Sequence, residues 1–219
     1  MKKNQTFVLT VLFLFTAVIY SQTKNFVVVS PNGELKVEVN LGDKIYYSII
    51  SGNEKLASNN HLGLMLQNET LGLNPKLINS KIAKVNELIK PDIALKYSTV
   101  PNVYNSLVLK FKGNYAVEFR AFDEGIAYRF VTTKKGEIEV INENFAVNFP
   151  TNYFLHLQQT GGFKTSSEEE YSHIQSSNWK ASDNMSTLPV LIDTKKNYKI
   201  LICESDLSDY PGMFLKGTG

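Results

Sequence analysis

Cysteine is almost absent from this sequence: Cys203 is the only one among 219 residues. A chain with one cysteine cannot form an internal disulfide or a thiolate metal cluster. Cys203 ends the strand-like segment 198–203, so we expect its thiol to be buried and inert. No cysteine lies near the N-terminus, which excludes lipid attachment there.

Several motifs that carry chemistry are also missing. The three histidines, His61, His156 and His173, are far apart, and none belongs to a His-x-x-x-His or His-Glu-x-x-His pair. The sequence has no Gly-Lys-Ser/Thr phosphate loop and no Gly-x-Ser-x-Gly nucleophile elbow. We therefore expect the histidines to be surface or structural residues.

The sequence has no excess of either charge once its first residues are set aside. Lys2 and Lys3 account for the formal net charge of +2. Without them acidic and basic groups balance, and no basic stripe remains, so we expect no nucleic-acid partner.

The N-terminus has the features of a secretory signal peptide. Lys2 and Lys3 precede an apolar run over residues 7–19, and Ala17 and Ser21 supply small residues near a cleavage point. The run is short for a bilayer span. We expect residues 1–21 to be removed, leaving a periplasmic or secreted protein with no membrane span.

The rest of the chain has the pattern of antiparallel strands. In residues 34–40 apolar side chains alternate with charged ones, and turn residues follow. Residues 117–131 repeat this alternation on both sides of Asp123-Glu124-Gly125, which predicts a hairpin with Gly125 in the left-handed conformation. Residues 81–89 suit a helix or a strand. We predict one all-β, antiparallel sandwich domain over residues 22–219.

Residues 159–187 interrupt this rhythm and are expected to form a long irregular loop. They contain the acidic run Glu168, Glu169 and Glu170, and the only tryptophan, Trp179. Carboxylates on irregular backbone suit Ca²⁺, although an acidic run more often lies in solvent. Both interpretations stay open on the residues alone.

Three segments together resemble the N-terminal domain of glycoside hydrolase family 97. Residues 119–130 read Phe-Arg-Ala-Phe-Asp-Glu-Gly-Ile-Ala-Tyr-Arg-Phe. Residues 167–171 are similar to that family's Tyr-Glu-x-x-Tyr loop, with Ser167 in place of the first tyrosine. Residues 204–212 fit its Glu-x-x-Leu-x-x-Tyr-Pro-Gly motif. The order and spacing of these three segments make the resemblance specific. The resemblance extends over nearly the whole mature chain.

The resemblance implies a β-super-sandwich like that of galactose mutarotase, followed in the family by a (β/α)₈ catalytic barrel. In the family the barrel carries the acid and the base or nucleophile that cleave α-linked glucosides or galactosides. By its place in the motif, Glu168 would supply one ligand to a Ca²⁺ ion held mainly by barrel glutamates. Trp179 would stack on sugar at the pocket rim or be buried against the barrel.

The leading hypothesis is therefore an N-terminal family 97 domain, truncated before the barrel and inactive alone. Residues 213–219 support it, because they begin a hairpin that has no return strand. The alternatives are a free-standing periplasmic carbohydrate-binding module and a purely structural secreted β protein.

Overall fold

The structure is a computed structural model, and it describes residues 24–93, 96–166, 168–208 and 210–219. The predicted signal peptide, residues 1–21, lies outside the described residues. Among those described, no helix combines the length and apolar character that crossing a bilayer would require. Every strand pair described is antiparallel, so the predicted all-β antiparallel class is confirmed.

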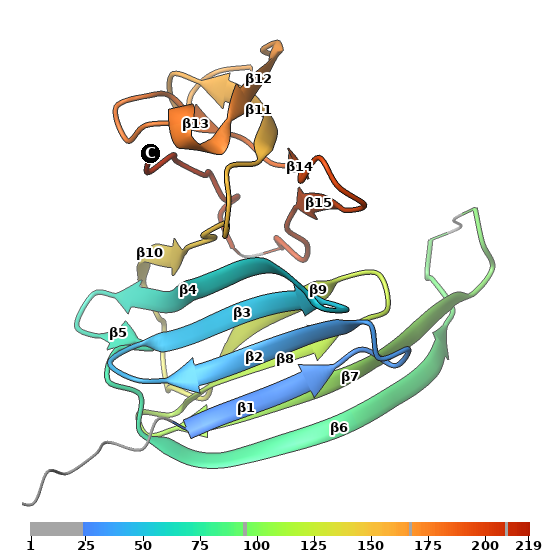
Figure 1. Cartoon of the computed structure of the whole chain (residues 1–219). Coiled ribbons are helices and arrows are strands. Elements are labelled where there is room, and N and C mark those ends of the chain that lie inside the picture. Colours follow the sequence, from blue (N-terminus) through green and yellow to red (C-terminus); the bar gives the residue numbers. More distant parts are fainter. Residues whose placement is uncertain (1–23, 94–95, 167, 209) are drawn as a thin grey trace, which may run out of the picture.

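Two sheets face each other and form a sandwich (Figure 1). The first sheet has the order β1-β2-β3-β4-β10, with β5 paired to β4. Its strands are β1 (Lys24–Val29), β2 (Leu35–Leu41), β3 (Ile45–Ser51), β4 (Glu54–Leu66), β5 (Thr70–Leu71) and β10 (Val140–Phe145). The second sheet has the order β6-β7-β8-β9. Its strands are β6 (Leu77–Ile89), β7 (Val100–Phe111), β8 (Tyr115–Ala121) and β9 (Ile126–Thr132).

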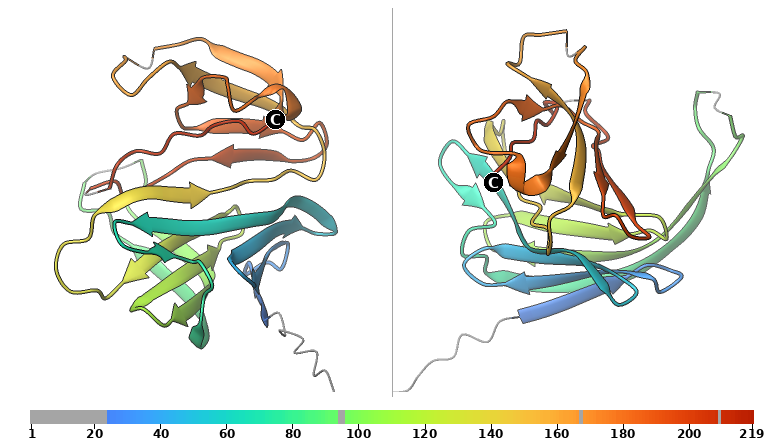
Figure 2. Two further views of the ribbon diagram at one scale, coloured as in Figure 1. Left: turned by 90° about the vertical axis from the view of Figure 1, so that its left-hand side faces the viewer. Right: turned by 45° about the horizontal axis from the view of Figure 1, so that its top comes forward.

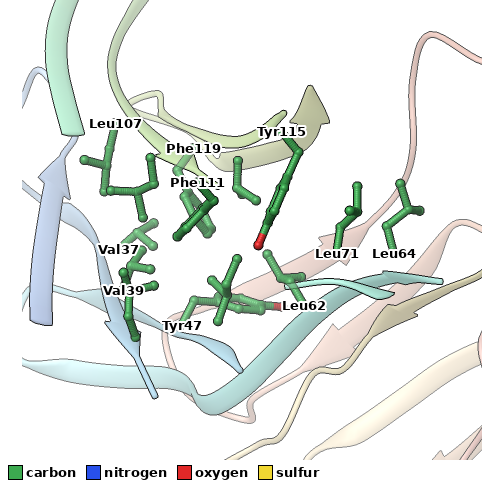
Figure 3. Close-up of a cluster of buried hydrophobic side chains, with 14 of the residues drawn as sticks. Val37, Val39, Tyr47, Leu62, Leu64, Leu71, Leu107, Phe111, Tyr115 and Phe119 are labelled. Carbon is green, nitrogen blue, oxygen red and sulfur yellow. The ribbon is translucent and has the colours of Figure 1, made fainter. Parts of the chain in front are cut away.

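The sandwich core is made by the alternating apolar residues of both sheets. Val37 and Val39 of β2 face Leu107 of β7 and Phe119 of β8 across the layer (Figure 3). All four side chains have at most 1% of their surface exposed. The period-two pattern that predicted the strands is thus the pattern that fills the core.

A third, smaller sheet lies over the sandwich, beside the β4–β10 edge (Figures 1 and 2). Its order is β12-β11-β14-β15, with β13 paired to β11. Its strands are β11 (Phe154–Thr160), β12 (Tyr171–Gln175), β13 (Met185–Ser186), β14 (Val190–Asp193) and β15 (Lys199–Ile202), and the short 3-10 helix η1 (Ser176–Asn178) follows β12. The inner face of this sheet has its own apolar core, centred on Leu157, Trp179 and Ile192.

The structure corrects three sequence-based predictions. Residues 159–187 are not a continuous loop, because β12 and β13 form within them. Gly125 does not have a positive φ; the loop is a four-residue connection closed by the Phe122 N–H and the Gly125 carbonyl oxygen, 2.9 Å apart, and such loops are commonly built on turns with negative φ. Cys203 is exposed, because it follows Leu201 on the outward phase while Ile200 and Ile202 face inward.

The ambiguous segment 81–89 is strand. It forms part of β6, which pairs with β7 along its length from Leu77 to Ile89. The pairing partner, and not the local pattern, decides between helix and strand here.

Candidate functional site

The predicted calcium ligand lies on the segment between β11 and β12. Glu168, Glu169 and Glu170 are all exposed on irregular backbone immediately before β12 begins at Tyr171. The Glu168 N–H donates to Ser166 Oγ at 3.4 Å, and Gln158 Nε2 donates to the Glu169 carbonyl oxygen at 2.7 Å. These contacts hold the backbone of the segment and leave its carboxylates facing solvent.

The described residues fit a calcium ion only in part. Ca²⁺ takes six to eight oxygen ligands. Within the described ranges, no three or more His, Cys, Asp or Glu side chains come together in a way that could hold a metal ion. Glu168 can therefore offer one carboxylate, and the remaining ligands would have to come from outside the described residues or from water.

The structure buries Trp179 in the core of the small sheet, where 6% of its surface is exposed. Its indole Nε1–H donates to the Asn184 carbonyl oxygen at 3.0 Å. Its own carbonyl oxygen accepts from the Gly219 N–H at 2.9 Å. A Cβ at Gly217 would lie 2.2 Å from that same oxygen, so only glycine allows this close approach. No described hydrogen bond or ring contact joins Trp179 to Glu168.

A groove of 580 Å³ opens between the sandwich edge and the inner face of the small sheet. Polar side chains line one part, among them His61, Asn144 and Asn148, and Phe145 and Phe149 lie beside them. Trp179, Phe214 and Leu215 line another part of the groove. The groove thus combines amide groups with aromatic faces.

A carboxylate that we did not single out from the sequence stands at the edge of this groove. Glu143 of β10 accepts from the Tyr128 hydroxyl at 2.5 Å and from the Tyr210 hydroxyl at 2.8 Å. Burial, and then the nearby Glu143 carboxylate, raise the pKa of Tyr128 and of Tyr210 well above the ordinary value of 10.0. Both phenols therefore stay neutral donors. We call Tyr128, Glu143 and Tyr210 the latch.

The Glu-x-x-Leu-x-x-Tyr-Pro-Gly segment has a structural explanation in these contacts. Both carboxylate oxygens of Glu204 accept from the Met213 N–H, at 3.0 and 2.8 Å, across the turn that contains Pro211 and Gly212. Tyr210 joins the latch. The motif could have pointed to Tyr210, but its partner Glu143 lies 67 residues away in sequence and nothing local marks it.

Leu215 is also paired, although residues 213–215 were expected to begin a strand with no partner. Its N–H donates to the Ser186 carbonyl oxygen at 2.9 Å, and the Ser186 N–H donates to its carbonyl oxygen at 2.8 Å. The C-terminal segment is therefore fastened to β13 and to Trp179.

The chain is similar in sequence and fold to known proteins. The chain is 32% identical over 204 residues to a retaining alpha-galactosidase of Bacteroides thetaiotaomicron, a match that covers 89% of this chain and 31% of that protein. A variant of a glycoside hydrolase family 97 enzyme from Pseudoalteromonas sp. strain K8 has a similar fold, with a TM-score of 0.71 and 23% identity over 87% of this chain and 30% of that one. A beta-arabinopyranosidase structure gives a TM-score of 0.69 and 24% identity, over 81% and 31%.

The chain thus spans less than a third of the length of these relatives. The family model of the glycosyl-hydrolase 97 N-terminal domain matches residues 28–219, which is nearly all of the described chain. The chain therefore belongs to the glycosyl-hydrolase 97 N-terminal family.

Proposed function

We propose that this chain is the supporting N-terminal domain of a secreted α-glycosidase that acts on α-linked glucosides or galactosides, and that it is inactive alone. One observation carries the proposal: the family match fills the chain, yet the chain covers only 31% of the retaining alpha-galactosidase. The domain would pack on a (β/α)₈ barrel that supplies the acid and the base. The leader-like residues 1–21 support export to the periplasm or medium.

In this proposal Glu168 gives one carboxylate oxygen to a composite calcium site. Its exposure and its place on irregular backbone support that role, because a ligand shared between domains must project from its own surface. When bound, the ion would supply a positive charge near the substrate. The domain's own contribution is to present Glu168, held by the backbone contacts of the β11–β12 connection.

For Trp179 we propose a supporting role in place of sugar stacking. Its ring packs under the small sheet and its Nε1–H is already bonded. Stacking on a sugar would require an exposed ring face.

The second candidate function is a carbohydrate-binding module, and the groove of 580 Å³ favours it. Its amide groups and aromatic faces are of the kind that bind sugar hydroxyls and sugar rings. Titration with malto-oligosaccharides and galactosides tests this candidate, and Asn148→Ala should weaken any binding in the groove. No binding at millimolar sugar would dismiss it.

The leading proposal is tested in two steps. The purified chain is assayed on aryl α-glucosides and α-galactosides with calcium, and we expect no turnover; activity that a chelator abolishes would contradict inactivity alone. A chimera is then made in which this chain replaces the matching third of the Bacteroides thetaiotaomicron alpha-galactosidase. We expect Glu168→Gln to reduce the calcium response of this chimera, whereas Glu169→Gln, its matched control, leaves it intact. If both variants of the folded chimera respond to calcium equally, Glu168 is not a ligand of the calcium site.

A further inference from the structure

Two histidines that are far apart in sequence meet on the outer face of the small sheet. His156 of β11 and His173 of β12 are directly opposite each other in the strand register. Their ring centroids are 4.7 Å apart with an interplanar angle of 71°, and their Nδ1 atoms are 2.5 Å apart. Each ring therefore directs its Nδ1 atom at one common point between the strands.

The pair is accessible from solvent. Leu155 and Leu157, the neighbours of His156 on β11, face the buried core, so His156 faces outward. His156 is half-buried and His173 is exposed. The structure gives neither Nε2 atom a hydrogen bond within the described part of the chain, so nothing there holds the rings in another direction.

The hydrogen bond between the rings also leaves a lone pair directed at the same point. At most one Nδ1 can carry the shared proton at this distance, and the other must accept. The nearby Asp193 carboxylate interacts electrostatically with His156 and accepts from Lys199 Nζ, while Lys195 Nζ lies over the Phe154 ring. The Asp193 carboxylate thus forms its ion pair with Lys199. The imidazole pair has no salt-bridge partner among the described residues.

We propose that His156 and His173 form a binding site for one borderline-soft divalent cation, of the class of Zn²⁺, Ni²⁺ or Cu²⁺, through both Nδ1 atoms. Imidazole nitrogens select these ions, whereas Ca²⁺ takes oxygen ligands, so this site is distinct from the one proposed at Glu168. Within the described residues no third His, Cys, Asp or Glu completes the set. Water fills the remaining positions.

The geometry needs only a small adjustment. Zinc–nitrogen bonds of about 2.0–2.1 Å at a tetrahedral angle place two nitrogens about 3.3 Å apart. The Nδ1 atoms must separate by roughly 0.8 Å from their present 2.5 Å. Rotation of the exposed His173 ring can supply this shift without moving either strand. The ion takes the place of the shared proton, which moves from Nδ1 to the free Nε2 atom of the same ring as that imidazole changes tautomer.

Metal binding here would cross-link β11 and β12. Because β12 begins directly after Glu170, the cation would also restrain the segment that carries Glu168. This effect does not depend on the proposed function, since it concerns the two strands of this chain alone.

The test is a calorimetric titration of the purified chain, without a polyhistidine tag, with Zn²⁺ alone at neutral pH. We expect one ion per chain. His156→Gln and His173→Gln should each weaken binding more than tenfold, and His61→Gln, the matched control on β4, should leave it unchanged. Equal binding by all three variants, or no binding at millimolar zinc, would overturn the proposal.

A second measurement needs no substitution. Nitrogen NMR of the histidine side chains in the unaltered chain should show zinc-induced shifts at the Nδ1 atoms of two of the three histidines. If zinc shifts the signals of only one histidine, or of none, the His156–His173 site is contradicted.

Discussion

Glu118 shows how a single carboxylate can be held by two arginines at the surface of a sheet. It lies on β8 with 8% of its surface exposed. It accepts from Arg120 Nε at 2.9 Å and from Arg129 Nε at 2.6 Å. The Arg120 guanidinium also lies 4.8 Å from the centre of the Tyr104 ring, a distance suited to a cation–π contact.

This arrangement makes stability depend on pH. Partial burial raises the pKa of Glu118, but the hydrogen bonds from Arg120 and Arg129 outweigh it and lower the pKa below its ordinary value of 4.5. A carboxyl with a lower pKa in the folded state stabilises above its unfolded pKa and loses that contribution as pH falls through its folded pKa. We expect Glu118→Gln to reduce the free energy of unfolding by about 1.5–3 kcal/mol at neutral pH.

The free energy of unfolding is measured by urea titration at two pH values, one neutral and one below the folded pKa of Glu118. The difference between Glu118→Gln and the unaltered chain should shrink as the pH falls from about 4.5 through that lower pKa. Glu124→Gln, in the exposed β8–β9 loop, is the control and should change little. A difference that stays constant with pH would mean that ionisation of Glu118 does not contribute.

At the same scale, the alternating pattern marks Arg120 and Arg129 as polar positions of the hairpin but does not show the carboxylate that they share. Arg129 meets its cross-strand neighbour Glu118. That neighbour was indistinguishable from any solvent-facing charge in the alternating pattern. Glu143 was missed for a related reason: its partners Tyr128 and Tyr210 come from distant segments, and only the fold brings them together.

Among the elements, the hairpin of β6 and β7 stands apart because it extends beyond the sandwich (Figure 1). The pairing of β7 with β8 ends at Asn105 and Ala121. Beyond it, β6 and β7 pair only with each other, from Val85 and Tyr104 to Ile89 and Val100. We call residues 85–93 and 96–104 the arm. Leu88 and Ile93 on it are 70% and 80% exposed.

The arm should be the least stable part of the second sheet. A two-stranded hairpin has little core of its own and is marginal in water. We expect amide hydrogens in the arm to exchange roughly 100-fold faster than those of residues 106–111, which lie between two strands. Peptide-level hydrogen exchange measures this, with residues 115–121 as a protected reference. Equal protection along β7 would contradict it.

The elements also show the limits of local patterns. Strands with clean alternation, such as β2 and β8, were predicted because one face of each is buried in the core. The strand β12 was missed because Ser172, His173 and Gln175 weaken its alternation, and pairing with β11 supplies the stability that its composition lacks. Gly125 was assigned a left-handed conformation from a three-residue loop, whereas pairing of Ala121 with Ile126 makes the loop four residues long.

On the scale of the whole molecule, two separate apolar cores are joined by a set of polar contacts. The sandwich core and the core of the small sheet share no buried residue among those described. Asn148 N–H donates to Asn60 Oδ1 at 2.5 Å, and the Tyr47 hydroxyl donates to the Ala146 carbonyl oxygen at 3.0 Å. Lys196, between β14 and β15, also pairs with Glu54 of β4, with Nζ and Oε1 2.8 Å apart. The latch is a further connection, because Glu143 belongs to the sandwich and Tyr210, which packs against the sandwich core, belongs to the C-terminal segment.

The latch should therefore help the two cores to unfold together. Tyr210→Phe removes one hydrogen bond to a carboxylate, a contribution of about 1.5–3 kcal/mol, and should loosen the C-terminal segment, which packs on Trp179. As the only tryptophan, Trp179 reports the small core by fluorescence, while far-ultraviolet circular dichroism reports mainly the sandwich. We expect Tyr210→Phe to move the fluorescence transition to lower urea ahead of the dichroism transition. Tyr46→Phe, which removes a surface bond to Asp43, should leave the two coincident; coincidence in both variants would mean that the cores are coupled without the latch.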